Sequence, residues 1–149
     1  MQQVVKTFIG LAFTFVEQFI ESQASEPEII VLEMVNFEPK THGQQEFSFY
    51  NGYYGSHCYL PLVMNEGLSG HLVTAVLRTG KRPTGALYAM VIKRVLKFEQ
   101  KHWPHTHIYR RGDSNESNPE LMELTHDDPL IDFIYGLSNN AVLNRKVKP

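Results

Sequence analysis

Residues 28–37 read Glu-Ile-Ile-Val-Leu-Glu-Met-Val-Asn-Phe and form a run that is apolar on both of its alternating faces. This pattern is typical of a strand that is covered on both sides, inside a sheet. Pro39 ends the run. The stretch therefore predicts an internal strand. The segments on either side of it predict the other elements of the fold.

On the N-terminal side, residues 2–22 predict an amphipathic helix, because apolar residues such as Phe13 and Val16 recur at helical spacing. Pro27 breaks the pattern. The apolar run at residues 8–16 is shorter than the roughly 20 residues that a bilayer span needs. A packed helix is therefore favoured over a secretory signal.

On the C-terminal side, aromatic and β-branched runs predict antiparallel meander strands, at residues 47–54, 57–64 and 70–78. A helix is expected at residues 85–101, with an apolar stripe of Leu87, Met90, Val91, Val95 and Phe98. A strand, a short helix and another strand should follow, at residues 106–111, 119–126 and 131–137. This order predicts an α/β fold in which helices flank a mixed sheet.

The composition fits one soluble domain, since the 149 residues are 42% hydrophobic and 20% charged. The one cysteine, Cys58, excludes an internal disulfide. It sits in an apolar run, where a buried small residue is expected rather than a nucleophile. These features predict an intracellular, cytoplasmic protein without membrane attachment.

The charges are unevenly distributed along the chain. Residues 78–111 hold nine Lys and Arg against one Glu, although the whole chain has a formal net charge of −2. A basic segment next to carboxylates suits a site that binds a phosphodiester backbone together with a metal. A solvated basic helix face explains the same pattern. The charges leave both interpretations open.

Four short motifs lie along this chain: Thr41-His42-Gly43-Gln44-Gln45, Phe49-Tyr50-Asn51-Gly52-Tyr53-Tyr54, Cys58-Tyr59-Leu60-Pro61-Leu62 and Arg111-Gly112-Asp113-Ser114. Together they resemble the catalytic domain of bacterial insertion-sequence transposases of the DDE type, over roughly residues 12–145. The resemblance implies a ribonuclease-H-like mixed sheet flanked by helices, here incomplete. Residues 1–27 are then expected to be an N-terminal helical segment, and residues 28–149 a partial catalytic domain.

In this family three acidic residues hold two divalent cations for DNA cleavage and strand transfer, so the resemblance implies Mg²⁺ or Mn²⁺ in an active protein. Asp113 matches the second acid. The first strand of the family reads roughly Leu-Asp-x-Asp-x-Thr. Here Glu33 stands at the first Asp and Val35 at the second, the ligand position. Catalytic and metal roles are therefore predicted for Asp113 and Glu33, although Glu33 is rooted about 6.6 Å away along the strand.

The resemblance also departs from the family after the second acid. Asn115 and Glu116 replace the Gly-Phe that usually follows Gly-Asp-Ser, and none of Glu116, Glu120 or Glu123 matches the third acid. We therefore expect a truncated, degenerate copy with impaired catalysis. A carboxylate in an apolar strand must be paired, so without a metal Glu33 needs a neighbouring cation or a hydrogen-bond partner.

DNA is the partner that the resemblance implies, as both transposon ends and target. The candidates for DNA contacts are Arg78, Lys81, Arg82, Arg110 and Arg111, with His42 in a loop near the predicted active face. An incomplete sheet would expose apolar faces, which favours self-association. Two classes of function remain open: a strand-transferring enzyme, or a non-catalytic relic that binds DNA or protein.

Two further groups of residues have plainer explanations. Three histidines could form a weak zinc site, but Pro104 prevents one continuous helix from presenting them: His102, His105 and His107. Four tyrosines of the predicted meander are expected in the core rather than in a base-stacking platform: Tyr50, Tyr53, Tyr54 and Tyr59.

Overall fold

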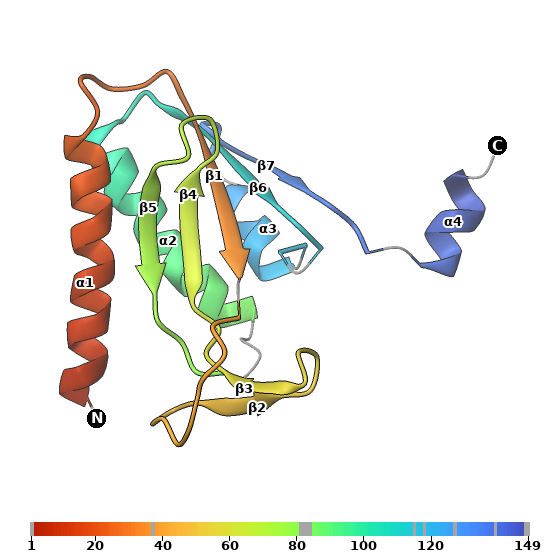
Figure 1. Ribbon diagram of the computed structural model, residues 1–149. Helices are drawn as coiled ribbons and strands as arrows, with labels where there is room; N and C mark the ends of the chain where they lie inside the picture. The colour runs from red at the N-terminus through yellow and green to blue at the C-terminus, as the bar shows by residue number, and fades with distance from the viewer. Residues whose placement is uncertain are drawn as a thin grey trace.

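The computed structural model describes residues 2–36, 38–80, 85–114, 116–117, 119–126, 128–138 and 140–147. Its centre is a five-stranded sheet in the order β5-β4-β1-β6-β7 (Figure 1). The strands are β1 Ile29–Asn36, β4 Leu62–Glu66, β5 Leu72–Val76, β6 His107–Gly112 and β7 Ile131–Tyr135. β4 is antiparallel to both β1 and β5, whereas β1, β6 and β7 are parallel. The mixed sheet that the order of elements predicts is confirmed.

The two faces of β1 meet different surroundings. Ile30 and Leu32 are each 3% exposed, because they enter the core. Ile29 and Val35, which alternate with them, are 48% and 46% exposed. The prediction that this strand is covered on both sides is therefore wrong for the described part of the chain, where the helices cover one face.

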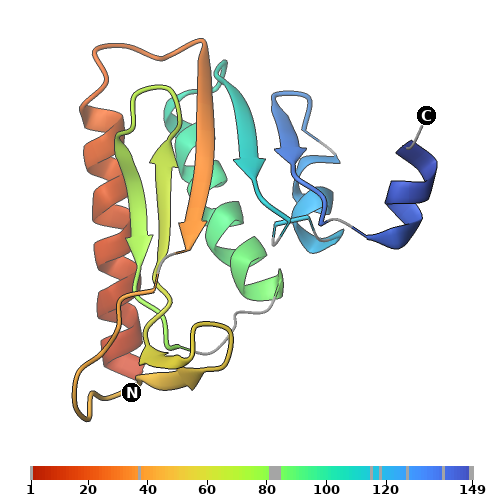
Figure 2. The same cartoon turned by 45° about the vertical axis from the view of Figure 1, so that its right-hand side comes forward.

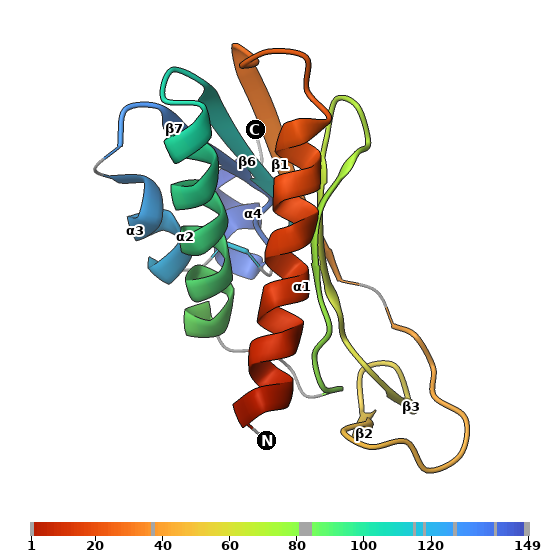
Figure 3. The same ribbon diagram turned by 90° about the vertical axis from the view of Figure 1, so that its left-hand side faces the viewer.

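Three helices cover that face of the sheet (Figure 3): α1 Gln2–Glu21, α2 Gly85–His102 and α3 Pro119–His126. α1 packs against β5 and α2, and α3 packs against α2 and β7. The core fills the space between helices and sheet, and its members include Val16, Phe19, Leu62, Met64, Val73, Ile92, Val95, Leu96, Ile108 and Leu121. The predicted N-terminal helix is thus part of the same core as the sheet.

α2 buries a stripe that differs from the predicted one. Val95 is buried as expected, together with Ile92 and Leu96, but Met90 is 43% exposed. Glu99 continues the buried stripe with no exposed surface. The apolar periodicity identified the helix, but a hydrophobic pattern cannot recognise an acidic residue inside the buried face.

The predicted meander forms only in part. β2 Phe49–Asn51 pairs with β3 Ser56–Cys58 in a separate two-stranded ribbon (Figure 2), so the predicted strand at 57–64 is divided between β3 and β4. Tyr50 and Tyr53 in this ribbon are 61% and 89% exposed. The expectation that they pack in the core is wrong. Cys58 is buried, as predicted.

A short helix that the sequence pattern does not indicate, α4 Ala141–Val147, follows β7. It contacts no other element of the described chain and stands apart from the sheet in Figure 1. Among the described helices, none is both long and apolar enough to cross a membrane.

Candidate active site

The predicted acids approach one another because β1 and β6 are parallel neighbours. Their register pairs Ile29 with His107 and continues to Glu33 with Arg111. Val35 and Asp113 each lie two residues beyond this last pair, so the register places both at the same end of adjacent strands. Asp113 is exposed just past the end of β6. Val35, which the resemblance places at the position of the family's first acidic ligand, is thus next to Asp113.

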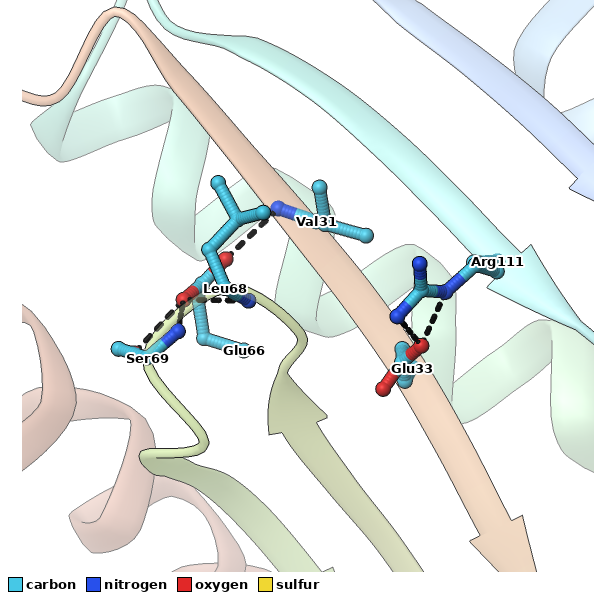
Figure 4. Close-up of polar contacts among 6 residues, drawn as sticks. All are labelled: Val31, Glu33, Glu66, Leu68, Ser69 and Arg111. Carbon is cyan, nitrogen blue, oxygen red and sulfur yellow. Dashed lines mark hydrogen bonds and ion pairs between the residues drawn. The ribbon is translucent and has the colours of Figure 1, made fainter.

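Glu33 forms an ion pair with Arg111 across the two strands (Figure 4). Arg111 Nε donates a hydrogen bond to Glu33 Oε1, and Nη2 lies against the same oxygen. The pair packs over Gly67, where an added Cβ would come within 3.0 Å of Glu33 Cδ and 3.2 Å of Arg111 Nη2. Arg111 is therefore the neighbouring cation that Glu33 was expected to need, and Gly67 leaves room for the pair.

A second carboxylate beside β1, Glu66, holds a turn together. Its side chain accepts hydrogen bonds from the backbone N–H of Val31 at 3.1 Å, of Leu68 at 3.1 Å and of Ser69 at 2.6 Å, and from the Ser69 hydroxyl at 2.6 Å (Figure 4). Burial by itself would raise the pKa of Glu66, but the hydrogen bonds outweigh it and lower the pKa. Glu66 therefore links the turn between β4 and β5 to β1 as an ionised group.

Glu116 lies at the same strand end, and sequence reasoning did not identify it as a site residue. Its N–H donates to the Asp113 carbonyl at 3.1 Å, and a Cβ at Gly112 would overlap its carboxylate. Burial raises the pKa of Glu116 to about 8, the charge of Arg110 opposes the shift, and those of Asp113 and Glu33 add to it. The available signal was its position, since the resemblance predicts a packing Phe where this chain has Glu116.

Arg110 points into the core, on the face of the sheet opposite Glu33, and its charge acts on Glu116. It is 3% exposed, its Nη1 donates to the Leu121 carbonyl at 2.8 Å, and its guanidinium lies 5.4 Å from the centre of the Tyr135 ring. Burial raises the pKa of Tyr135 to about 12, an effect that Arg110 opposes and Glu116 reinforces. Strand alternation places Arg110 on the helix-covered face, opposite Arg111. The buried Arg110 side chain therefore does not meet the prediction that it contacts a phosphate.

The other candidates for DNA contacts have different surroundings. Arg111 and His42 are exposed, and His42 lies in the loop after β1, where its carbonyl accepts from Gln45 Nε2 at 3.3 Å. Arg78 is half-buried after β5. Lys81 and Arg82 lie outside the described residues. The structure thus brings Glu33, Arg111 and Asp113 together at one end of the sheet.

This arrangement does not fit a two-metal site. Glu33 is held by Arg111, the Glu116 carboxylate is buried over Gly112, and the side chain of Val35 has no oxygen. Within the described residues, no group of three or more His, Cys, Asp or Glu side chains could hold a metal ion. Divalent cations need several oxygen ligands close together, and these residues do not supply them.

The histidines of the suggested zinc site have other neighbours. His102 Nδ1 lies 2.8 Å from the Phe98 carbonyl, and His107 Nε2 lies 2.8 Å from an Asp132 carboxylate oxygen. They therefore do not form a metal cluster in the described part of the chain.

The strand order, the parallel β1–β6 pair and the acid at the end of β6 define a ribonuclease-H-like domain of the kind found in transposase catalytic domains. The sequence matches the family described as transposase DDE domain group 1 over residues 2–149, so the chain belongs to this family. A comparison with curated proteins gave no match.

One solved transposase shares the fold. The piggyBac transposase in a synaptic complex with hairpin DNA is similar with a TM-score of 0.54 and 13% identity, over 99% of this chain and 32% of that chain. The Drosophila P element transposase in a strand transfer complex gives a TM-score of 0.43 and 9% identity, over 81% of this chain and 29% of that chain. This chain thus spans about a third of the length of these transposases.

Proposed function

We propose that this protein is a catalytically impaired DDE transposase domain from a bacterial insertion sequence. The observation that carries the proposal is the valine at position 35, beside Asp113, in a domain of a family whose chemistry needs a carboxylate there. The insertion-sequence origin is supported by the motifs around His42, Tyr53, Tyr59 and Asp113.

Impairment follows from the chemistry that this family performs. DNA cleavage and strand transfer use two divalent cations, Mg²⁺ or Mn²⁺, to activate the attacking oxygen and stabilise the leaving oxygen. Asp113 would be one ligand. Glu33 would have to leave Arg111 to become another, and its root lies two residues from the position of the missing acid. The proposed metal and catalytic roles of Asp113 and Glu33 are therefore those of a weakened site.

DNA is the proposed partner, and both the transposon ends and the target DNA would be bound. Exposed Arg111 beside Asp113 could contact a phosphate once Glu33 is displaced or neutralised, and His42 lies in a loop that is open to solvent. Arg78 and the adjacent Lys81 and Arg82 add positive charge along the chain. A bacterial DNA partner would place the protein in the cytoplasm.

A second candidate is a non-catalytic module that binds DNA or protein. The uncovered face of the sheet favours it, because Ile29, Val35 and Ile134 are 48%, 46% and 62% exposed. Exposed apolar side chains grouped on one face are typical of interaction surfaces. Self-association through this face is compatible with the impaired-transposase proposal.

Calorimetric titration with Mn²⁺ tests the proposal. The parent chain should bind Mn²⁺ weakly or not at all. The Val35→Asp variant should bind at least about tenfold more tightly, because it puts a second carboxylate next to Asp113 and affinity rises with the number of charged ligands. The double variant Val35→Asp/Asp113→Ala should lose this gain, and circular dichroism would verify that each variant is folded.

The Glu33→Ala variant tests whether the metal site is impaired or whether Glu33 replaces the missing aspartate as a ligand. If Glu33 is committed to Arg111, removing it should leave the weak binding of the parent unchanged. Tight Mn²⁺ binding to the parent that both Glu33→Ala and Asp113→Ala abolish would contradict impairment, and it would show that Glu33 replaces the missing aspartate.

A further inference from the structure

The ribbon of β2, β3 and their connecting turn, residues 49–58, exposes an unusual amount of aromatic surface. Tyr50, Tyr53 and Tyr54 are 61%, 89% and 36% exposed. Tyr53 and Tyr54 meet edge to face at 4.9 Å, and Tyr50 meets His57 in the same manner at 5.5 Å across the ribbon. Single exposed apolar residues need no explanation, but a group of aromatic rings on one short ribbon indicates a surface used for binding.

The ribbon is firmly held, although its rings are exposed. Asn51 Nδ2 donates to the Gly80 carbonyl at 3.0 Å, while Asn51 Oδ1 accepts from the Tyr53 N–H at 3.0 Å. The Gly55 N–H donates to the Asn51 carbonyl at 2.8 Å and closes the turn. The rings are therefore presented on a pre-arranged backbone, which lowers the entropy lost when a ligand binds.

The ribbon lies at the end of the sheet that carries the candidate acids. β1 ends at Asn36 and the chain then leads into the ribbon, which Figure 1 shows beyond the arrowhead of β1. β6 runs parallel to β1, so Asp113 lies at this same end. A nucleic acid that binds at Asp113 would thus lie at the same end of the sheet as the exposed tyrosines.

We propose that this ribbon is a stacking surface for unpaired DNA bases, with Tyr53 as its main contact. This inference rests on the proposed function, because it assumes that the chain binds DNA. Aromatic rings stack on bases without sequence preference, since every base offers a flat face. Tyr53 has the largest exposed fraction of the three tyrosines, so its ring is the most accessible to a base.

The charges near the ribbon favour base stacking over phosphate binding. The segment before the ribbon carries both signs of charge, with Lys40 close in sequence to Glu38 and Glu46. Glu38 also accepts a hydrogen bond from Ser56 of β3, so a carboxylate lies against the ribbon itself. A surface of such mixed charge attracts a phosphate backbone weakly, and the rings remain as its distinctive chemistry.

The test measures binding of the full chain to labelled DNA by fluorescence anisotropy. The probes are a single-stranded oligonucleotide, the same strand with abasic sites throughout its centre, and the corresponding duplex. The variants are Tyr53→Ala, Tyr53→Phe, which keeps the ring, and Tyr109→Ala as a matched control. Tyr109 lies on β6, stacked on His107, away from the ribbon.

For the single strand, Tyr53→Ala should raise Kd about tenfold, which is within the range measured for loss of one stacked base. Tyr53→Phe and Tyr109→Ala should stay within about twofold of the parent. The abasic strand should bind the parent and Tyr53→Ala equally, and the salt dependence should not change, because stacking displaces no counterions.

Three results would overturn the inference, and they have different meanings. If the parent and Tyr53→Ala bind the single strand equally, the stacking surface is contradicted, while the proposed DNA binding still stands. Absence of binding to every probe by the folded parent would overturn the proposed DNA partner and the stacking surface together. Equal loss in Tyr53→Ala and Tyr109→Ala would also contradict a specific role for the ribbon.

Discussion

At the scale of single residues, Glu99 shows how an acid can be part of a core. It lies on the buried stripe of α2 with no exposed surface, and neither carboxylate oxygen has a hydrogen-bond partner among the described residues. Burial raises its pKa to about 8, well above the ordinary value of 4.5. At neutral pH the folded protein therefore keeps Glu99 protonated, while the unfolded chain ionises it.

Glu99 should make the protein less stable as pH rises. Between pH 4.5 and about 8 the folded state binds more protons at this site than the unfolded state, so the free energy of unfolding falls through that window and then levels off. The total loss should be roughly 3–5 kcal/mol. Urea unfolding at several pH values should show Glu99→Gln to be more stable than the parent at pH 8.5, and nearly equal to it at pH 5.

Two details of this experiment decide its interpretation. Glu116, whose pKa is also about 8, should leave part of the slope in the Glu99→Gln variant. Glu123→Gln is the control, because Glu123 is exposed on α3 and should leave the pH dependence of the parent unchanged. Parallel stability curves for the parent and Glu99→Gln would contradict a raised pKa of Glu99 in the folded protein.

The strand positions of the candidate-site residues determine on which face of the sheet each side chain lies. Glu33 and Arg111 are paired in the register of β1 and β6, so their side chains meet on the uncovered face. Arg110, one residue earlier, faces the core instead. The sequence singles out all three as site candidates, but strand alternation decides which face of the sheet each side chain occupies.

At the scale of elements, the ribbon depends on one close approach of the backbone. A Cβ added at Gly80 would overlap the carbonyl oxygens of Cys58 and Phe49, which belong to the two strands of the ribbon. These atoms are backbone and cannot rotate away. Glycine is therefore required at position 80, because the segment after β5 runs directly against the ribbon.

We expect Gly80→Ala to loosen the ribbon and to cost about 1–3 kcal/mol of stability, as overpacking usually does. Limited digestion with chymotrypsin, which cleaves after aromatic residues, should cut the variant faster than the parent at Tyr50 to Tyr54. Gly52→Ala is a matched control, since an added Cβ at Gly52 meets nothing within 4 Å. Equal resistance of Gly80→Ala and the parent would contradict the close packing.

At the scale of the whole molecule, the helices are unequally divided between the faces of the sheet. α1, α2 and α3 cover one face, as Figure 3 shows, and in the described chain no helix covers the other. That face carries Ile29 and Val35 of β1 and Ile134 of β7, which are between 46% and 62% exposed. Burial of such side chains against a second molecule releases water and favours association.

We expect the protein to self-associate with rising concentration, and Ile134→Glu to reduce this tendency, because a charge on the uncovered face must be desolvated on contact. Sedimentation velocity over a concentration series would measure it. Leu68→Glu is the control, because Leu68 is 72% exposed in the turn between β4 and β5, outside the sheet face. A parent that remains monomeric throughout, or equal effects of both variants, would exclude the uncovered face as the contact.

The sequence by itself determined the order of elements, because apolar periodicity and turn residues act locally. It indicated α1, β1, α2, β6, α3 and β7 near their observed positions. It also indicated a DDE transposase domain, since the motifs that carry the resemblance are contiguous stretches. The need of Glu33 for a cation or a hydrogen-bond partner followed from the cost of placing an unpaired carboxylate among apolar residues.

Only the tertiary structure decided which surfaces those elements share. The separation of β2 and β3 from the main sheet, the burial of Glu99 and Glu116, and the exposure of Tyr53 depend on contacts between distant segments. The same holds for the choice of Arg111 as the partner of Glu33, which requires the parallel register of two strands 78 residues apart. Local sequence patterns do not determine which distant segments come into contact. The environments of these side chains are therefore set only by the tertiary structure.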